Sequence, residues 1–287
     1  MLGLVNVYIK LTKPRIAVLL LISTAAGLLA AGKGSAPIET SILVLLGGYL
    51  CAGGAASMNC YLDRDIDSKM SRTKNRPIPL GQITPRNALV FSIAISILSI
   101  PLFVAINLTV LVLGILAWLY YVLFYSMFLK RKTTQNIVIG GAAGAFPPLI
   151  GWTAITGSID LPSIFLFLIV FFWTPPHAYA LMLALREDYK KVNIPMMPVV
   201  EGDRRTIQQI IGYTIILIIV TTLPVFLNIF GYLYFMVALI LGTILLSMGI
   251  RLYFTMKYSL ALRLWRYSNL YLALLFVGLV LDQSIVI

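Results

Sequence analysis

Nine long apolar stretches dominate this chain of 287 residues and limit the folds open to it. A helix that crosses a bilayer needs about 20 mostly apolar residues, and each stretch comes close to that length. A transmembrane β-barrel is excluded, because barrel strands alternate polar and apolar residues and these stretches are continuously apolar. The sequence predicts an all-α, polytopic membrane helix bundle with about nine transmembrane helices, near residues 14–32, 38–57, 88–106, 108–128, 135–155, 161–184, 207–228, 231–250 and 267–286.

The amino-acid composition agrees with a membrane location. Hydrophobic residues make up 60% of the chain and charged residues 11%, and the mean hydropathy is +0.95. A soluble domain of this length needs more charge to cover its surface. Because no polar linker divides the chain, we expect one domain over residues 1–287, surrounded by a lipid bilayer. Its catalytic loops are expected at about residues 58–87 and 185–206.

Lysine and arginine side chains gather on one side of the predicted spans. With nine spans in place, Lys33 alone among the 22 lysines and arginines falls on the other side of the membrane. Loops rich in Lys and Arg usually face the cytoplasm. We therefore predict a cytoplasmic N-terminus and a C-terminus outside. The formal net charge of +12 then reflects membrane topology, and no nucleic-acid partner is expected.

The segment after the second apolar stretch carries oxygen donors at helical spacing. Asn59, Asp63 and Asp67 are four residues apart, so they share one face if the helix continues through them. Two carboxylates one turn apart repel each other unless a cation lies between them, and Mg²⁺ accepts carboxylate and phosphate oxygens. Asp65 points away from this face. The spacing favours a magnesium site at one end of the membrane.

Cationic side chains follow the aspartates within ten residues. Arg72, Lys74 and Arg76 can neutralise phosphate oxygens, and an arginine can do so with two hydrogen bonds. The alternative is a solvated loop of mixed charge in which the acidic spacing arose by chance. We favour a functional site, because ionisable groups at a membrane boundary usually have a function.

The pattern from Asn59 to Pro77, N-x-x-x-D-x-x-x-D-x-x-M-x-R-T-x-x-R-P, resembles the signature of the UbiA-type superfamily of intramembrane prenyltransferases. It is most similar to the branch that farnesylates protohaem IX. Further similar stretches are Lys13-Pro14-Arg15, residues 125–157, the run Trp173-Thr-Pro-Pro-His177, and residues 188–199. The combination is specific and covers most of residues 10–210.

This resemblance implies farnesyl diphosphate as donor, protohaem IX as acceptor, haem O as product and Mg²⁺ as cofactor. A haem A synthase or a terminal oxidase pathway would then be the partner that uses the product. The short segment before the first span favours the plasma membrane of a prokaryote, with the active site on the cytoplasmic side. The implied metal ligands are Asn59, Asp63, Asp67 and Asp188, and the implied diphosphate-binding residues are Arg72, Arg76, Lys130, Arg131, Lys190 and Lys191.

The second acidic motif of the superfamily is incomplete here. Asp188 matches it, but Val192 and Asn193 stand where a second spaced acid is common.

Two other functions remain open. One is prenyl transfer to a quinone or another aromatic acceptor. The other is transport of a lipidic or anionic solute, although transporters favour broken helices at midplane and this chain has its charges at one mouth.

His177 is the only histidine, and it lies inside an apolar stretch after two prolines. On position alone it is either a hydrogen-bonded core residue or a functional group. The resemblance favours a catalytic or haem-binding role for His177, with Trp173 beside it at the acceptor. A group of aromatic side chains ends the fourth stretch and forms either an interfacial belt or the wall of a prenyl tunnel: Trp118, Tyr120, Tyr121, Phe124 and Tyr125.

Overall fold

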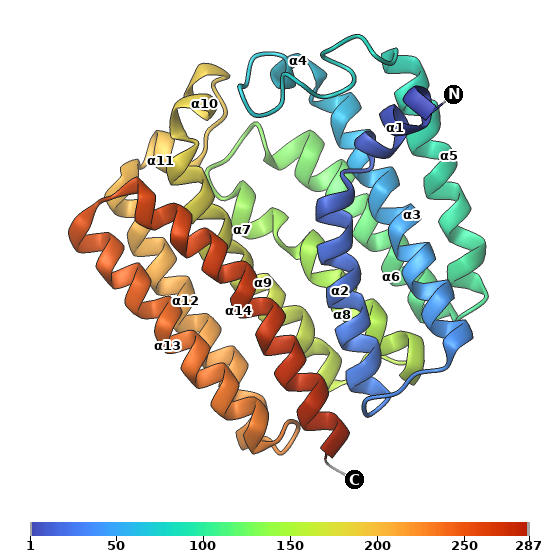
Figure 1. The fold of residues 1–287 in the computed structure, drawn as a ribbon, viewed down its shortest axis with the longest axis vertical. Helices are drawn as coiled ribbons and strands as arrows, with labels where there is room; N and C mark the ends of the chain where they lie inside the picture. The colour runs from blue at the N-terminus through green and yellow to red at the C-terminus, as the bar shows by residue number, and fades with distance from the viewer. Residues whose placement is uncertain (1, 286–287) are drawn as a thin grey trace.

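The computed structural model describes residues 2–285 and is built from helices (Figure 1). Within that range nine segments are long and apolar enough to cross a membrane, which confirms the predicted number. They are α2 (Pro14–Ala31), α3 (Ile38–Leu62), α5 (Pro85–Val104), α6 (Leu108–Leu119) with the π-helix η1 (Tyr120–Leu129), α7 (Asn136–Gly140) with α8 (Ala142–Thr156), α9 (Leu161–Ala184), α12 (Gly202–Phe226), α13 (Tyr232–Thr255) and α14 (Tyr258–Ile285).

Four short helices lie outside these spans. They are α1 (Leu2–Leu11), α4 (Arg64–Asp67), α10 (Arg186–Lys191) and α11 (Met197–Val200). All four lie at the end of the bundle that is uppermost in Figure 1, whereas α14 ends at the opposite end of the bundle. We call the uppermost end in Figure 1 the basic end, because it carries the Lys- and Arg-rich loops. That the basic end faces the cytoplasm stays a prediction.

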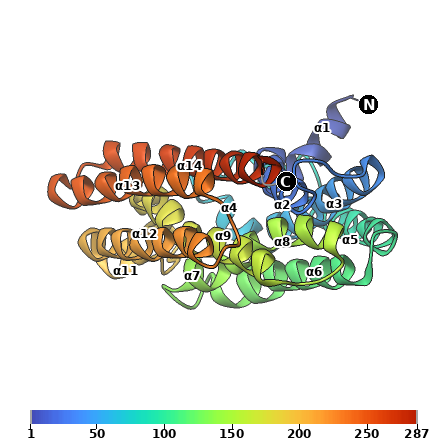
Figure 2. The same ribbon diagram turned by 90° about the horizontal axis from the view of Figure 1, so that it is seen from below.

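The spanning helices form a closed ring in which each contacts the next. The order around it is α2, α3, α5, α6, α8, α9, α12, α13, α14 and back to α2. Additional contacts between α2 and α8 and between α9 and α14 flatten the ring into two rows, which Figure 2 shows from below. The ring thus has a first half (α2 to α8) and a second half (α9 to α14).

The two helices that close the first half approach each other through glycines. A Cβ atom on Gly27 would lie 2.1 Å from the carbonyl oxygen of Pro148, and one on Gly151 would lie 1.9 Å from that of Thr24. Only glycine allows such close contact between membrane helices. This seam holds α2 against α8.

The last span begins earlier than predicted, at Tyr258 instead of near residue 267. Its first turns carry Arg263 and Arg266, which hydropathy alone assigns to a loop. The helix extends beyond its apolar part because the basic end holds it there. The hydroxyl of Tyr258 donates to Asp203 at 2.8 Å, and Asp203 also accepts from Arg186 at 3.1 Å.

Candidate active site at the basic end

Asp63 lies at a break between α3 and α4. Its φ of −91° and ψ of 6° end α3 at Leu62, although the amide of Asp67 still donates to the carbonyl of Asp63 at 2.8 Å. The condition that one continuous helix runs through Asn59, Asp63 and Asp67 is therefore not met. The loop after α4 holds Asp67 in a separate position. The Thr73 hydroxyl donates to the Asp67 carbonyl at 2.9 Å, and Arg76 Nη1 donates to the Asp67 carboxylate at 2.6 Å.

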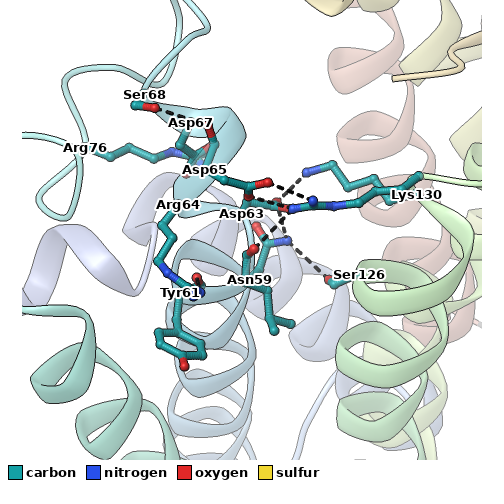
Figure 3. A network of polar contacts seen from close by, with 12 residues as sticks. Asn59, Tyr61, Asp63, Arg64, Asp65, Asp67, Ser68, Arg76, Ser126 and Lys130 are labelled. Carbon is teal, nitrogen blue, oxygen red and sulfur yellow. Dashed lines mark hydrogen bonds and ion pairs between the residues drawn. The ribbon is translucent and has the colours of Figure 1, made fainter. Parts of the chain in front are cut away.

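The Asp63 carboxylate is fully buried in a cluster of polar groups drawn from three segments (Figure 3). Asn59 Nδ2 donates to Asp63 Oδ2 at 2.8 Å, and Lys130 Nζ pairs with the same oxygen. Lys13 Nζ donates to Asn59 Oδ1 at 2.6 Å. Asp63 Oδ1 has no hydrogen-bond partner, and Arg131 Nη2 lies 3.8 Å from it. A buried carboxylate oxygen without a hydrogen bond is available to a bound cation.

The π-helix η1 brings Ser126 to this cluster and ends directly before Lys130. Its wider turn is visible in the hydrogen bond from the Lys130 amide to the carbonyl of Tyr125, five residues earlier, at 3.0 Å. Ser126 Oγ accepts from Asn59 Nδ2 at 3.2 Å and donates to the carbonyl of Tyr121 at 2.9 Å. π-Helical turns are frequent at functional sites.

The two lysines of the cluster lie largely out of solvent. Burial lowers the pKa of Lys13 and of Lys130, and the negative charge of Asp63 partly opposes this effect on both pKa values. Burial disfavours an ammonium ion unless an anion compensates it. Burial therefore outweighs the attraction of Asp63 in its effect on the pKa of both lysines.

Asp65 and Arg131 form a separate pair at the surface. Two Arg131 nitrogens donate to the two Asp65 oxygens at 2.8 and 2.7 Å, and one of them also donates to the carbonyl of Leu62 at 3.2 Å. The hydrogen bonds from Arg131 lower the pKa of Asp65. The pair braces the end of α3, and Arg131 Nη2 lies between the two aspartates, 2.7 Å from Asp65 Oδ1 and 3.8 Å from Asp63 Oδ1.

Asp188 lies on α10, opposite the loop that follows α4. The hydroxyl of Ser71 donates to its carboxylate, and Lys191 Nζ lies 3.4 Å from Oδ1. The hydrogen bond from Ser71 is the largest cause of a lowered Asp188 pKa, and Lys191 adds to it. Lys190 and Arg72 are exposed nearby. The loop 68–77 thus connects the Asp67 side of the site to Asp188.

The four predicted metal ligands do not meet at one point. Asn59 and Asp63 are bonded to each other, Asp67 pairs with Arg76, and Asp188 pairs with Ser71. Among residues 2–285, no three His, Cys, Asp or Glu side chains converge as metal ligands would. The oxygen donors fall into an Asn59–Asp63 position and an Asp188 position, joined by the loop 68–77.

An apolar cavity of about 220 Å³ opens beside the Asp63 cluster, inside the first half of the ring. Lys13 lines it at the polar end, so one side chain belongs both to the cavity wall and to the cluster. Small residues leave the space, and the wall includes Gly48, Ala52, Ala55, Ala56, Ala117, Ala143 and Gly144.

The aromatic group at the end of the fourth span divides between its two predicted roles. Trp118 and Tyr121 line the cavity. Phe124 is exposed on the outer surface, as expected of a side chain that faces lipid. The ring of Tyr125 packs on Gly140, where a Cβ atom would lie 2.2 Å from it, and the Tyr120 hydroxyl donates to the carbonyl of Ile139 at 2.8 Å.

His177 and Trp173 lie together in the second half, between α9 and α14. Their rings stack with centroids 4.3 Å apart. His177 Nδ1 lies 2.8 Å from Ser268 Oγ, and Trp173 Nε1 donates to the carbonyl of Ser268 at 2.7 Å. Neither residue is among those that line the apolar cavity.

The sequence prediction missed three polar residues of the site: Lys13, Ser71 and Ser126. Lys13 alone left a signal, because it precedes Pro14 at the start of the first span. The structure gives it a left-handed backbone with φ of 51°, and its ammonium group reaches Asn59, 46 residues away in the chain. Nothing in the local sequence distinguishes the two serines from ordinary polar loop or helix residues.

Comparison with known proteins decides the family. The sequence profile of the UbiA prenyltransferase family matches residues 20–279. The chain belongs to this family. Two curated relatives are the protoheme IX farnesyltransferases of Gloeothece citriformis (45% identical, covering 98% of this chain and 88% of the relative) and Roseiflexus sp. (43% identical, covering 99% and 53%). The chain spans about half the length of the Roseiflexus relative.

Solved UbiA-type structures share the fold. A digeranylgeranylglyceryl phosphate synthase superposes with a TM-score of 0.82 at 20% identity, with 99% of each chain covered. A UbiA homologue from Archaeoglobus fulgidus bound to GPP and Mg²⁺ superposes with a TM-score of 0.69 at 19% identity, covering 95% of this chain and 99% of the homologue. The nine-span ring is therefore the fold of this family.

Proposed function

We propose that this UbiA-family protein transfers a farnesyl group from farnesyl diphosphate to a vinyl group of protohaem IX and so produces haem O. The observation that carries the proposal is the direct junction of the Asp63 cluster with the apolar cavity at Lys13. A donor with a charged head and a hydrocarbon tail needs such a junction. The relatives named protoheme IX farnesyltransferase, 41–45% identical to this chain, supply the acceptor.

The diphosphate head would bind at the Asp63 cluster. Lys13 and Lys130 already lie there, and their lowered pKa values reflect burial without full compensation by anions. Exposed Arg72, Lys190 and Lys191 lie on the loop 68–77 and on α10, from where they would contact the outer phosphate. Arg76 and Arg131 are bound to Asp67 and Asp65, so they would first position those carboxylates.

The donor set also suits Mg²⁺. Asp63 Oδ1 has no hydrogen bond, and the remaining donors at the two acidic positions are amide and carboxylate oxygens, which are the ligand type of this ion. Asn59 and Asp63 would hold Mg²⁺ at the first position and Asp188 at the second, with Asp67 positioned by Arg76. When bound, Mg²⁺ would stabilise the negative charge that grows on the departing diphosphate.

The chemical step breaks the bond between the allylic carbon and the bridging oxygen, and its electron pair leaves with the diphosphate. Lys13 and Lys130 would stabilise that charge where it develops. The vinyl π electrons of the acceptor then form the new carbon–carbon bond, and water adds to the resulting cation and loses a proton. The apolar walls exclude water from the allylic cation before capture. His177 and Trp173 would contact the acceptor from α9.

The test uses membranes that contain the full-length protein, labelled farnesyl diphosphate, Mg²⁺ and protohaem IX, with extraction and mass analysis of the haems. A farnesylated haem that needs both the protein and Mg²⁺ is expected. A parallel reaction receives quinone precursors in place of haem. Label in the quinone fraction alone would replace haem by an aromatic acceptor, and no transfer to either would reject the prenyltransferase proposal.

A further inference from the structure

The apolar cavity ends at one aromatic side chain. Phe103, near the end of α5, lines the cavity and is only 2% exposed. Other residues line the same part of the cavity, far from Lys13. They include Thr24 on α2, Gly48 on α3 and Ile150 on α8. Lys13 and Phe103 thus mark opposite ends of one space. We propose that Phe103 is the floor of the prenyl cavity and limits the donor to three isoprene units.

Two glycines hold the Phe103 ring in place. A Cβ atom on Gly47 of α3 would lie 2.8 Å from Phe103 Cε1, and one on Gly114 of α6 would lie 2.5 Å from Cε2. The ring is therefore clamped between two helix backbones. It also belongs to a buried cluster with Val44, Val110 and Leu113. A ring held at both edges cannot swing aside to admit a longer chain without displacing a helix.

The depth of the cavity matches a farnesyl chain. Gly47 precedes Asn59 by twelve residues of the same helix, so the ring lies about 18 Å from the polar cluster at 1.5 Å per residue. An extended chain advances about 1.2 Å per bond, which gives roughly 13 Å for a farnesyl main chain and roughly 18 Å for a geranylgeranyl chain. The terminal methyl groups of the longer chain would overlap the ring, whereas those of the farnesyl chain would stop short of it.

This inference rests on the proposed function for the donor class but not for the acceptor. Its test therefore measures donor binding without any acceptor. The probes are unreactive thiolodiphosphates, in which sulfur replaces the bridging oxygen, with geranyl, farnesyl or geranylgeranyl chains. Their dissociation constants are measured on the full-length protein in lipid nanodiscs with Mg²⁺ present.

Wild type should bind the farnesyl probe at least about tenfold more tightly than the geranylgeranyl probe, since an apolar pocket discriminates by that much for a poorly fitting group. Phe103→Ala should remove this preference. Leu113→Ala is the matched control, because Leu113 is buried in the same cluster but does not line the cavity. It should keep the wild-type ratio of dissociation constants.

A second variant tests the floor from the opposite direction. Ala52→Leu on α3 fills the cavity above Phe103. It should weaken farnesyl relative to geranyl binding by at least about tenfold. If Phe103→Ala does not fold, this variant together with the chain-length preference of wild type decides whether the prenyl chain fills the cavity down to Phe103. Unchanged ratios in either folded variant, or no chain-length preference in wild type, would overturn the role of Phe103. Failure of every prenyl probe to bind would instead reject the prenyl donor itself.

Discussion

The two halves of the ring have the same helical construction but differently filled interiors. The first half encloses the apolar cavity, whose wall is rich in glycine and alanine. The second half is filled by large side chains, among them Tyr179, Tyr234 and Tyr271, all fully buried. Sequence pattern does not predict this difference, because both halves read as uniformly apolar. The size of the buried side chains decides which half can take up a hydrocarbon tail.

The acidic positions of the two halves also differ, in how deeply each carboxylate is buried and in what holds it. Asp63 of the first half is fully buried, is bonded to Asn59 and Lys130, and keeps one oxygen free of hydrogen bonds. Asp188 of the second half lies on a short helix and is held by a loop serine and an exposed lysine. The first position is preorganised, whereas the second depends on the loop 68–77.

Asp63→Asn should cause the largest loss. It keeps the size of the side chain but removes the charge that Lys130 needs and replaces one carboxylate oxygen by an amide NH2 group, which cannot bind Mg²⁺. The rate of prenyl transfer should fall by about 10³-fold, the upper range for one preorganised electrostatic group. The control is Asp65→Asn, whose carboxylate is exposed and bonded to Arg131. If Asp63→Asn folds and keeps more than a tenth of the wild-type rate, the Asp63 cluster does not bind the reacting diphosphate.

Lys130→Met should reduce the rate by about 10²-fold, as expected for one group that stabilises the leaving charge. Lys190→Met on the exposed side of α10 is the matched control and should cost only a few-fold. Equal effects of the two substitutions would contradict the preorganisation of the first half.

The same lysine predicts a pH effect. Burial lowers the Lys130 pKa, so its positive charge is lost at a lower pH than that of a free lysine. Transfer should therefore decline on the alkaline side before pH reaches the ordinary lysine pKa. Lys130→Arg keeps its charge at every accessible pH and should move that decline upward. An unchanged alkaline limb in this variant would mean that another group controls it.

A feature of the fold or the site can be predicted from the sequence when the residues that form it are close together in the chain. The nine spans follow from local runs of apolar residues, and the Asn59–Asp63 contact follows from four-residue spacing within one helix. The contacts of Asn59 with Lys13 and Ser126 join positions 46 and 67 residues apart, and the second depends on a π-helical turn that no local pattern announces. Phe103 was equally hidden, because an apolar side chain in an apolar span has no distinguishing mark.

Asp188→Asn should have a smaller effect than Asp63→Asn, about tenfold to 10²-fold on the apparent affinity for Mg²⁺ and diphosphate. The reason is that Asp188 is less buried than Asp63 and lies beside the exposed Lys190 and Lys191, which can still bind the diphosphate when the carboxylate is lost. Titration of transfer rate against Mg²⁺ at saturating donor separates binding from catalysis. A loss as large as that of Asp63→Asn, unrelieved by more Mg²⁺, would make the two halves equal contributors.

Ser71→Ala should give the smallest effect and the most specific one. It removes a hydrogen bond to the Asp188 carboxylate, a contact worth roughly three- to tenfold in binding. The Michaelis constant for the donor should rise while the maximal rate stays near wild type. Amide exchange should increase in the loop 68–77 and on α10 but not at Asn59 and Asp63, which are held by Lys13 and Lys130. Equal loosening of both positions would show that the loop organises the whole site, and the contrast between the halves would then fail.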